Sequence, residues 1–207
     1  MIKSKILKDL VIPIIGTLLL FIFIRSFIFF TAIIPSESMI PTLEVKDKII
    51  TSRIFDKDKL KRGDLVVFTG GGTHKHMHVK RIIGLPGDKL ELKENGDVLV
   101  NGKLLNEAYV KNQIVVHKHN EQCKHSEEKV IHDDEQNNKE HSSHEYQVLE
   151  MRLGKFEVPD GKFFFLGDNR VMSYDSRYWE NPYIDKEQIV GKLLFRIWPL
   201  EKFGKIE

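Results

Sequence analysis

The sequence predicts a mainly β protein, in which one N-terminal membrane-spanning helix precedes an antiparallel, barrel-like domain. Two observations carry this prediction. An apolar stretch near the N-terminus is long enough to cross a bilayer, and the rest of the chain alternates short β-branched or aromatic runs with turn residues. The chain has 207 residues, which suits one domain of about 100–200 residues with an accessory segment.

The overall composition excludes several classes of protein. Charged residues make up 30% of the chain, hydrophobic residues 41%, and the formal net charge is +2. These values exclude a disordered acidic protein and a polytopic membrane protein. A charge so near zero gives no general case for nucleic-acid binding. The single cysteine, Cys123, excludes an intramolecular disulfide framework and a zinc site made of cysteines alone.

The apolar stretch predicts a transmembrane helix over residues 10–30. Arg25 is the only charged residue between Leu10 and Ser36, and about 20 residues of helix cross the hydrocarbon core. A cleaved secretory signal is the main alternative. We favour an uncleaved anchor, because the small-x-small cleavage pattern is missing from residues 25–34.

Lysines before the predicted span set its expected orientation. Lys3, Lys5 and Lys8 precede the span, whereas the charges that follow it are of mixed sign. The positive-inside rule therefore places residues 1–9 in the cytoplasm and residues 31–207 on the outer side of the cell membrane, as an extracytoplasmic β domain.

Short runs in the remainder of the chain predict strands, because they are rich in β-branched and aromatic residues and are separated by Gly, Pro, Asp and Asn. These runs are residues 48–53, 64–68, 78–83, 89–91, 98–100, 109–110, 162–166 and 191–197. Asn101 and Gly102 favour a type I′ hairpin turn after the run 98–100. A short helix is expected near residues 183–190.

Residues 117–147 form a polar insertion in this domain. They hold six of the nine histidines of the chain and few apolar residues. Such a segment cannot bury enough apolar surface to offset its ordering entropy, so we expect an extended loop. Four residues of the insertion are of types that bind metals, namely His117, His119, Cys123 and His125. Their spacing matches no strong zinc-binding pattern.

The first candidate site lies just after the predicted span, where Ser36 and Ser38 stand between Pro35 and Pro41. In an extended segment the two serines face the same side. One can then serve as a nucleophile while the other donates its hydroxyl to an oxyanion. An ordinary juxtamembrane linker has a similar composition, so the motif alone leaves both interpretations open.

The second candidate is Lys80, which lies inside the apolar run 78–83. An ammonium without a partner is costly in such a place, so a buried lysine has a lowered pKa. A neutral lysine is a general base, and Ser–Lys pairs are a known variant of the serine nucleophile arrangement. The alternative is a solvent-facing lysine on an edge strand.

Three histidines alternate in front of Lys80 and would share one face of its strand. His74, His76 and His78 are weak candidates for a metal site or a pH sensor. We nevertheless expect neither a metal nor a cofactor.

The third candidate is the charged loop 167–177, which follows the apolar run 162–166. Its closely spaced carboxylate and guanidinium groups suit a buried network that orients other groups. A surface loop of the same composition is the alternative. The residues of interest in this loop are Asp168, Arg170, Ser173, Asp175 and Arg177.

Taken together and in order, these segments resemble the bacterial type I signal peptidases, in the short single-span form common in Gram-positive bacteria. The resemblance covers the span, the serine segment, residues 62–68, the Lys80 segment and loop 167–177, but not the histidine-rich insertion. It implies a mostly β catalytic domain and a serine endopeptidase that removes signal peptides without a cofactor.

The resemblance also implies roles for individual residues. Ser38 would be the nucleophile and Lys80 the general base, while the Ser38 N–H and the Ser36 hydroxyl would form the oxyanion hole. Ser173 would orient Lys80 through a hydrogen bond, and Met39 would shape the substrate pocket. The remaining residues would hold the charged loop against the catalytic strand; they are Asp168, Arg170, Asp175 and Arg177.

The implied partners are preproteins with small residues at the third and first positions before the cut, bound as an added strand. Membrane lipid and the secretion translocon are the other expected partners, and no nucleic acid is expected. Two alternatives stay open on the sequence alone: a protease dedicated to one substrate, and a membrane-tethered metal-binding scaffold that works through its histidine-rich loop.

Overall fold

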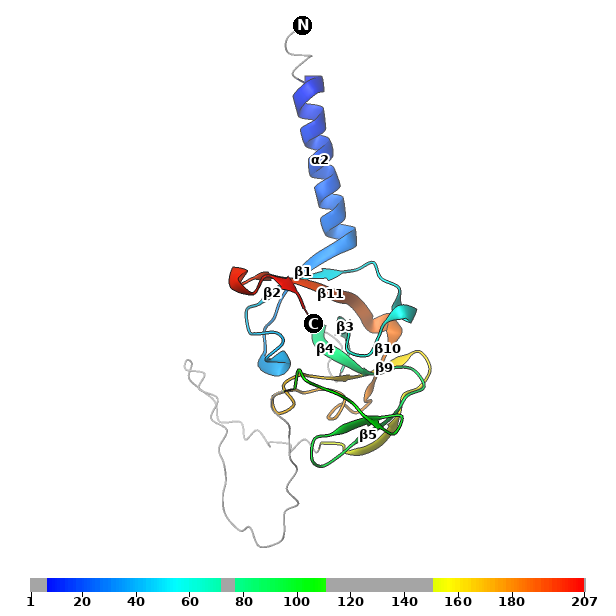
Figure 1. Cartoon of the computed structure of the whole chain (residues 1–207). Helices are drawn as coiled ribbons and strands as arrows, with labels where there is room; N and C mark the ends of the chain where they lie inside the picture. The colour runs from blue at the N-terminus through cyan, green and yellow to red at the C-terminus, as the bar shows by residue number, and fades with distance from the viewer. Residues whose placement is uncertain (1–6, 72–76, 111–150, 207) are drawn as a thin grey trace, which may run out of the picture.

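A computed structural model describes residues 7–71, 77–110 and 151–206 of the chain. A long helix stands clear of a domain of two β-sheets, and the chain enters that domain directly from the helix (Figure 1). The predicted histidine-rich insertion lies outside the described residues, as do His74 and His76.

The N-terminal helix, Lys8–Ile28, is long and apolar enough to cross a membrane. An α-helix (α2, Ile12–Phe23) lies between two π-helical turns (η1, Leu7–Val11, and η2, Ile24–Ile28). No side chain of α2 is buried, because apolar residues surround this helix instead of forming the single stripe that packs against a core.

The helix ends at Ile28, before the predicted end of the span at Phe30. Phe29 turns to an extended backbone (φ −128°, ψ 153°) and begins β1 (Phe29–Ile33). The N–H of Arg53 donates to the carbonyl of Ile28 at 2.8 Å, and β1 then pairs along β2. The sequence stays apolar across this change from helix to strand, so no composition signal marks the end of the helix.

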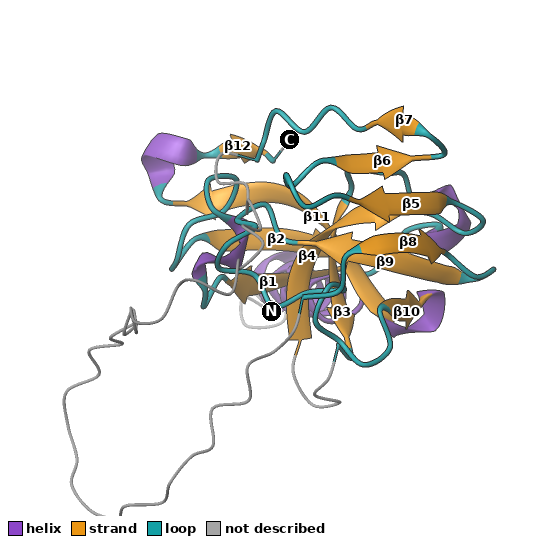
Figure 2. Cartoon of the chain, turned by 90° about the horizontal axis from the view of Figure 1, so that it is seen from below, coloured by secondary structure: helices purple, strands orange, loops and turns teal. Residues whose placement is uncertain are grey.

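All strand pairs are antiparallel, as the sequence predicts. The larger sheet has the order β1-β2-β11-β3-β4-β9-β10, with β12 paired to β11, and the smaller sheet has the order β7-β6-β5-β8 (Figure 2). The other strands are β2 (Lys48–Ser52), β3 (Leu65–Thr69), β4 (Met77–Gly84), β5 (Lys89–Leu92), β6 (Val98–Val100), β7 (Lys103–Leu104), β8 (Gly154–Glu157), β9 (Lys162–Leu166), β10 (Tyr183–Asp185), β11 (Ile189–Trp198) and β12 (Gly204–Lys205).

Most of the local predictions are confirmed. Every predicted strand is present except residues 109–110, which lie at a turn. The helix expected near residues 183–190 is wrong, because these residues form β10, a 3₁₀ turn (η5, Lys186–Gln188) and the start of β11. Asn101 and Gly102 have φ angles of 52° and 77°, the positive pair that a type I′ hairpin turn requires.

Strand β9 separates two apolar cores, because its uninterrupted apolar run is buried on both faces. Phe163 and Phe165 pack with Trp179 in the core of the larger sheet. Phe164 and Leu166 point the other way and pack in the core of the smaller sheet.

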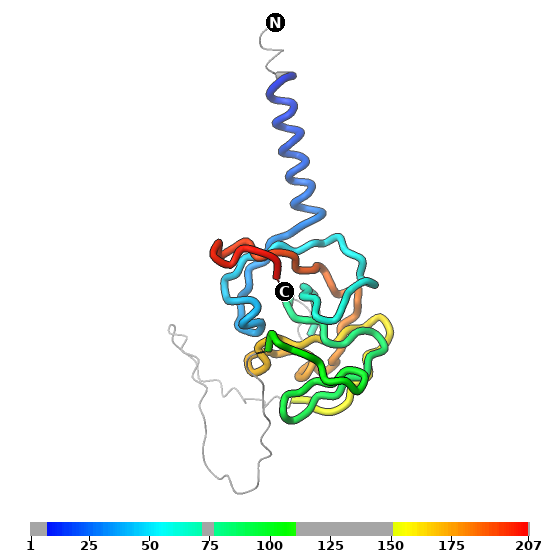
Figure 3. The backbone as a smooth tube through the Cα atoms, viewed as in Figure 1, coloured from blue at the N-terminus to red at the C-terminus, as the bar shows by residue number. Residues whose placement is uncertain are grey.

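A third core fixes the serine segment to the larger sheet. Met39 and Leu43 are fully buried there with Ile49 and Val67. The last strands of the chain also reach this region, since β11 pairs with β2, and in Figure 3 the red C-terminal part of the tube lies beside the blue part that follows the helix.

We predict that Gly84→Ala destabilises the domain. Gly84 ends β4 where the two sheets meet, and an added Cβ would lie 2.8 Å from side-chain atoms of Leu90 and Val158. Overpacking of this kind costs about 1–3 kcal/mol, so thermal unfolding should give a clearly lower Tm. Gly16→Ala is the matched control, because its added Cβ meets no atom within 4 Å, and its Tm should stay unchanged. An unchanged Tm for Gly84→Ala would contradict this account.

Candidate active site

The serine segment forms a tight turn. Glu37–Met39 make one turn of 3₁₀-helix (η3), which the buried Met39 side chain holds against the core. Ser38 is 7% exposed, and its Oγ lies 3.3 Å from the Oγ of Ser36. The two hydroxyls therefore meet across a turn, not along the extended segment that we expected. A buried turn of this kind is not a free linker.

Lys80 lies on β4 opposite Val66 of β3 and is only 4% exposed. The structure therefore excludes the solvent-facing alternative for this residue. Burial lowers the pKa of Lys80 to about 8, since a charged ammonium loses hydration there. Asp175 and Asp168 oppose this shift of the Lys80 pKa, while the positive charge of Arg177 supports it.

Ser38 and Lys80 line the same groove, which has a volume of about 490 Å³. It lies between β1 and the first half of β4, and most of its lining is apolar. The lining residues are Phe30, Thr31, Ala32, Ile33, Ile34, Pro35, Ser36, Ser38, Met39, Val67, Met77, His78, Val79 and Lys80. The structure thus brings both predicted catalytic residues and the predicted pocket residue Met39 to one place.

Two strand edges flank this groove. β1 is the first strand of the larger sheet, and among the described residues it pairs with β2 alone. β9 joins β4 only from Arg81 onward, so within the described part of the chain the first half of β4 pairs with β3 alone. Unpaired strand edges of this kind accept an added strand through main-chain hydrogen bonds.

Loop 167–177 is tied directly to the serine turn. The Asn169 N–H donates to the carbonyl of Ser38 at 3.1 Å, and its Nδ2 donates to the carbonyl of Glu37 at 3.2 Å. Gly167 permits this approach, because a Cβ there would lie 2.5 Å from the Ser38 carbonyl. We did not assign Asn169 from the sequence, where its only signal was its position inside the charged loop.

Ser173 is buried beside this contact. Its Oγ would lie 2.2 Å from a Cβ at Gly167, so it packs closely against that backbone. The Ser173 side chain also contributes to the lowered pKa of the Asp175 carboxyl. The expected contact of Ser173 with Lys80 stays a prediction.

Buried ion pairs hold the charged loop, so the alternative of a plain surface loop is wrong. Arg81 donates to Asp168 through Nε at 2.8 Å and Nη2 at 2.6 Å. Arg177 donates to Asp175 through Nε at 2.8 Å and Nη2 at 2.9 Å. Burial opposes ionisation of Asp175, but the Arg177 guanidinium and the hydrogen bond from the Gly167 N–H outweigh it and lower the pKa of the carboxyl.

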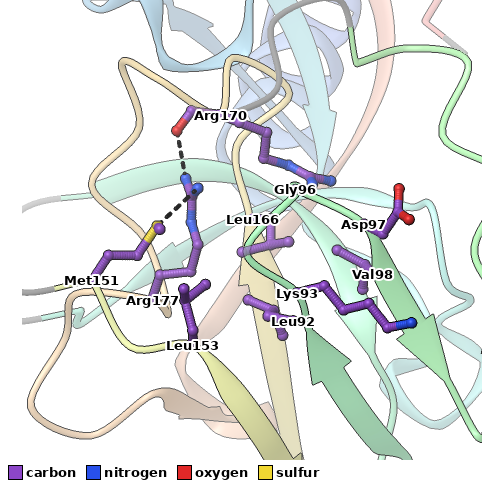
Figure 4. A pocket seen from close by; sticks show the side chains of 10 residues that line it. All are labelled: Leu92, Lys93, Gly96, Asp97, Val98, Met151, Leu153, Leu166, Arg170 and Arg177. Atoms are coloured by element: carbon purple, nitrogen blue, oxygen red, sulfur yellow. Dashed lines mark hydrogen bonds between the residues drawn. The ribbon is translucent and has the colours of Figure 1, made fainter. Parts of the chain in front are cut away.

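Figure 4 shows the guanidinium of Arg177 between the backbone carbonyl of Arg170 and the sulfur of Met151. Arg177 Nη2 donates to the carbonyl of Arg170 at 2.8 Å, and Arg177 Nη1 lies 3.8 Å from the Sδ of Met151. The guanidinium of Arg170 pairs with Glu107. We missed Glu107 from the sequence, because a lone carboxylate in a turn carries no signal of a long-range partner.

His78 also lines the groove. Its ring packs against the rings of Phe68 and Trp179, with centroid distances of 5.8 Å and 6.4 Å. No group of three or more His, Cys, Asp or Glu residues that could hold a metal occurs in the described ranges. The other two histidines of the predicted set, His74 and His76, lie outside those ranges.

Comparison with known proteins agrees with this combination of fold and groove. Residues 7–198 match the sequence profile of the family described as signal peptidase, peptidase S26. The chain therefore belongs to this family of serine proteases and is a hydrolase of the signal peptidase I class.

Two relatives in sequence support the same assignment. The chain is 34% identical to signal peptidase I P of Bacillus subtilis subsp. natto, over 97% of this chain and 93% of that one. It is 32% identical to signal peptidase I of Leptolyngbya laminosa, over 88% and 75% of the two chains. A crystal structure of a signal peptidase I from Enterococcus faecalis V583 is 28% identical, with a TM-score of 0.40, and covers 65% of this chain and 97% of that one.

We predict that Lys80→Met stabilises the protein in a pH-dependent manner. Below pH 8 the wild-type lysine is charged in both states, so the folded state bears the full cost of the buried charge. Between the folded pKa of about 8 and the unfolded pKa of about 10.4, only the unfolded state binds the proton, and wild-type stability rises with pH.

Urea unfolding at pH 7 and pH 10 measures this difference. The advantage of Lys80→Met over the wild type should be largest at pH 7 and should shrink by pH 10. The exposed Lys89 provides the control, since Lys89→Met should change stability equally at both pH values. An advantage of Lys80→Met that does not depend on pH would contradict a lowered Lys80 pKa.

Proposed function

We propose that this chain is a membrane-anchored serine endopeptidase that cleaves signal peptides from exported preproteins with a Ser38–Lys80 dyad. One observation carries the proposal: a lysine buried with a lowered pKa lines the same groove as a buried serine hydroxyl. Membership of the signal peptidase family supports the reaction class.

In the proposed mechanism neutral Lys80 takes the proton of the Ser38 hydroxyl. The Ser38 Oγ attacks the scissile carbonyl, and the oxyanion that forms accepts hydrogen bonds from the Ser38 N–H and the Ser36 hydroxyl. The Lys80 ammonium then gives its proton to the leaving amine. Lys80 next takes a proton from water, whose oxygen attacks the acyl carbonyl. The bond between that carbonyl and the Ser38 Oγ then breaks, and the Lys80 ammonium returns the proton to the Ser38 oxygen.

The charged loop would keep this arrangement fixed. Asn169 holds the carbonyl of Ser38, which limits movement of the nucleophile relative to β4. Asp168 ties the loop to Arg81, the residue next to Lys80. Asp175 and Arg177 close the loop on itself, with Arg177 bonded to the carbonyl of Arg170. Ser173 is buried in the middle of this loop, and we propose that its hydroxyl orients Lys80.

The groove supports recognition of an extended peptide with small side chains near the cut. A preprotein segment would lie between the open edges of β1 and β4 as an added strand. Apolar side chains of Met39, Val67 and Val79 line the groove together with Ser38, and we propose that they contact the residues before the cut. We expect small residues there, at the third and first positions before the cut.

Exposed apolar residues support contact with membrane lipid. Beyond the helix, large hydrophobic side chains are exposed on β1, at the end of β11 and in the turn that follows it; they are Ile33, Phe195, Trp198, Leu200 and Phe203. Aromatic side chains of this kind suit a membrane–water interface. We propose that the helix anchors the chain with residues 1–9 in the cytoplasm and the β domain outside, close to the translocon from which substrates emerge.

We predict that Ser38→Ala and Lys80→Ala abolish cleavage of a preprotein with an Ala-x-Ala site. The full chain in detergent would be assayed by product mass and by the N-terminal sequence of the mature product. Loss of the nucleophile or the base should lower kcat/KM by about 10³-fold or more. A chelator should have no effect. Retained cleavage in either variant by folded protein would overturn the dyad.

Ser36→Ala separates the oxyanion role from the nucleophile role. We predict a fall in kcat of about 10²–10³-fold with little change in KM, because the Ser36 hydroxyl would act only on charge that develops in the transition state. Ser36→Thr keeps a hydroxyl and is the matched control, which should retain most activity. Equal activity of the Ala and Thr variants would remove Ser36 from the mechanism. A panel of unrelated preproteins would distinguish a general peptidase from one dedicated to a single substrate.

A further inference from the structure

Residues 105–110 leave the smaller sheet after β7 and contact the catalytic half of the molecule. Two side chains make these contacts. Glu107 pairs with Arg170 of the charged loop, and the ring of Tyr109 lies under the guanidinium of Arg81, with 3.9 Å between the Arg81 Cζ and the ring centroid. Neither residue lines the groove, and neither has a role in the mechanism above.

The Tyr109 ring and the Asp168 carboxylate hold Arg81 from two directions. Asp168 binds the Nε and Nη2 atoms of Arg81, and Nη1 donates to the carbonyl of Gly63 at 2.8 Å. A ring stacked on the guanidinium face attracts the cation and restricts its rotation. The position of Arg81 over Asp168 therefore depends on the ring as well as on the ion pair.

Tyr109 is itself fixed by its hydroxyl, which donates to Glu107 Oε1 at 3.0 Å. Burial and the nearby Glu107 carboxylate raise the pKa of the phenol, so it keeps its proton and stays a donor. Since Glu107 also pairs with Arg170, the contacts run from Arg81 through Tyr109 and Glu107 to the charged loop.

We propose that Tyr109 is a positioning residue for the catalytic lysine, because its ring holds Arg81 over Asp168 and so sets the charge that Lys80 faces. This inference rests on the proposed role of Lys80 as the general base.

The charges around Lys80 give the direction of the expected effect. The loop presents Asp168, Asp175 and Arg177 to the lysine. The serine turn carries two hydroxyls and the exposed carboxylate of Glu37. On its own strand the neighbours with charge or a titratable ring are Arg81 and His78.

Asp175 is paired with Arg177. Asp168 is therefore the carboxylate whose ion pair with Arg81 depends on the Tyr109 ring. If Arg81 moves away, the negative charge of Asp168 acts on Lys80 with less compensation. That charge favours the ammonium, so the pKa of Lys80 rises and less neutral base is present at neutral pH.

The experiment compares Tyr109→Leu with Tyr183→Leu. Tyr183 packs edge-on against Phe164, 6.3 Å between centroids, in the core of the smaller sheet. Its loss reduces aromatic packing without touching Arg81. For each full-length variant in detergent, kcat/KM for the Ala-x-Ala preprotein would be measured across pH 5.5–9.5, together with the Tm.

We expect the acid limb of the Tyr109→Leu profile to move upward by about half a pH unit, which lowers kcat/KM about threefold at pH 7. Tyr183→Leu should lower the Tm without moving this limb. Tyr109→Phe keeps the stacked ring and should restore the wild-type limb. If Tyr109→Leu does not fold, Tyr109→Met, which fills a similar volume without a ring, takes its place.

The inference would be overturned if the acid limb of the kcat/KM profile did not move in Tyr109→Leu or Tyr109→Met. It would also be overturned if Tyr183→Leu moved that limb by the same amount. A shift in Tyr109→Phe as large as that in Tyr109→Leu would do the same, because it would trace the effect to the hydroxyl and not to the ring. These outcomes are distinct from failure of the proposed function, which would appear as wild-type protein that does not cleave or as cleavage that survives Ser38→Ala.

Discussion

The burial of Lys80 is the constraint on which the rest of the structure depends. A lysine in an apolar site either loses its proton easily or finds a carboxylate partner, and a close partner would keep it protonated. The two nearby carboxylates, Asp168 and Asp175, are each held by an arginine instead. Because each carboxylate pairs with an arginine, it can stay buried without forming an ion pair with Lys80.

The fold meets this constraint with neighbouring residues of one strand. Lys80 and Arg81 are adjacent on β4, and alternation points adjacent side chains to opposite faces. Lys80 can then line the groove, while Arg81 pairs with Asp168 of the loop that follows β9. The two-sided burial of β9 matters for the same reason, because it anchors that loop between two cores.

The features that could be predicted from the sequence are those whose signal lies within a short stretch of residues. The strands followed from apolar runs between turn residues, and the Asn101–Gly102 hairpin followed from the φ preference of those two residues. The start of β1 was not predictable, because helix and strand there share one apolar run. Glu107 and Tyr109 were missed because their partners, Arg170 and Arg81, are distant in sequence, and pairings of that kind appear only when two sheets have packed.

The direct passage from helix to strand has a geometric consequence. No loop separates Ile28 from β1, and β1 is paired to β2 from its first residue. An extended chain from Ile28 to Ser38 reaches at most about 35 Å, and the turn at Glu37–Met39 shortens this distance. Ser38 therefore lies at a limited distance from the end of the helix. If the helix spans the membrane as proposed, this distance would also limit how far from the bilayer a peptide bond could be cut.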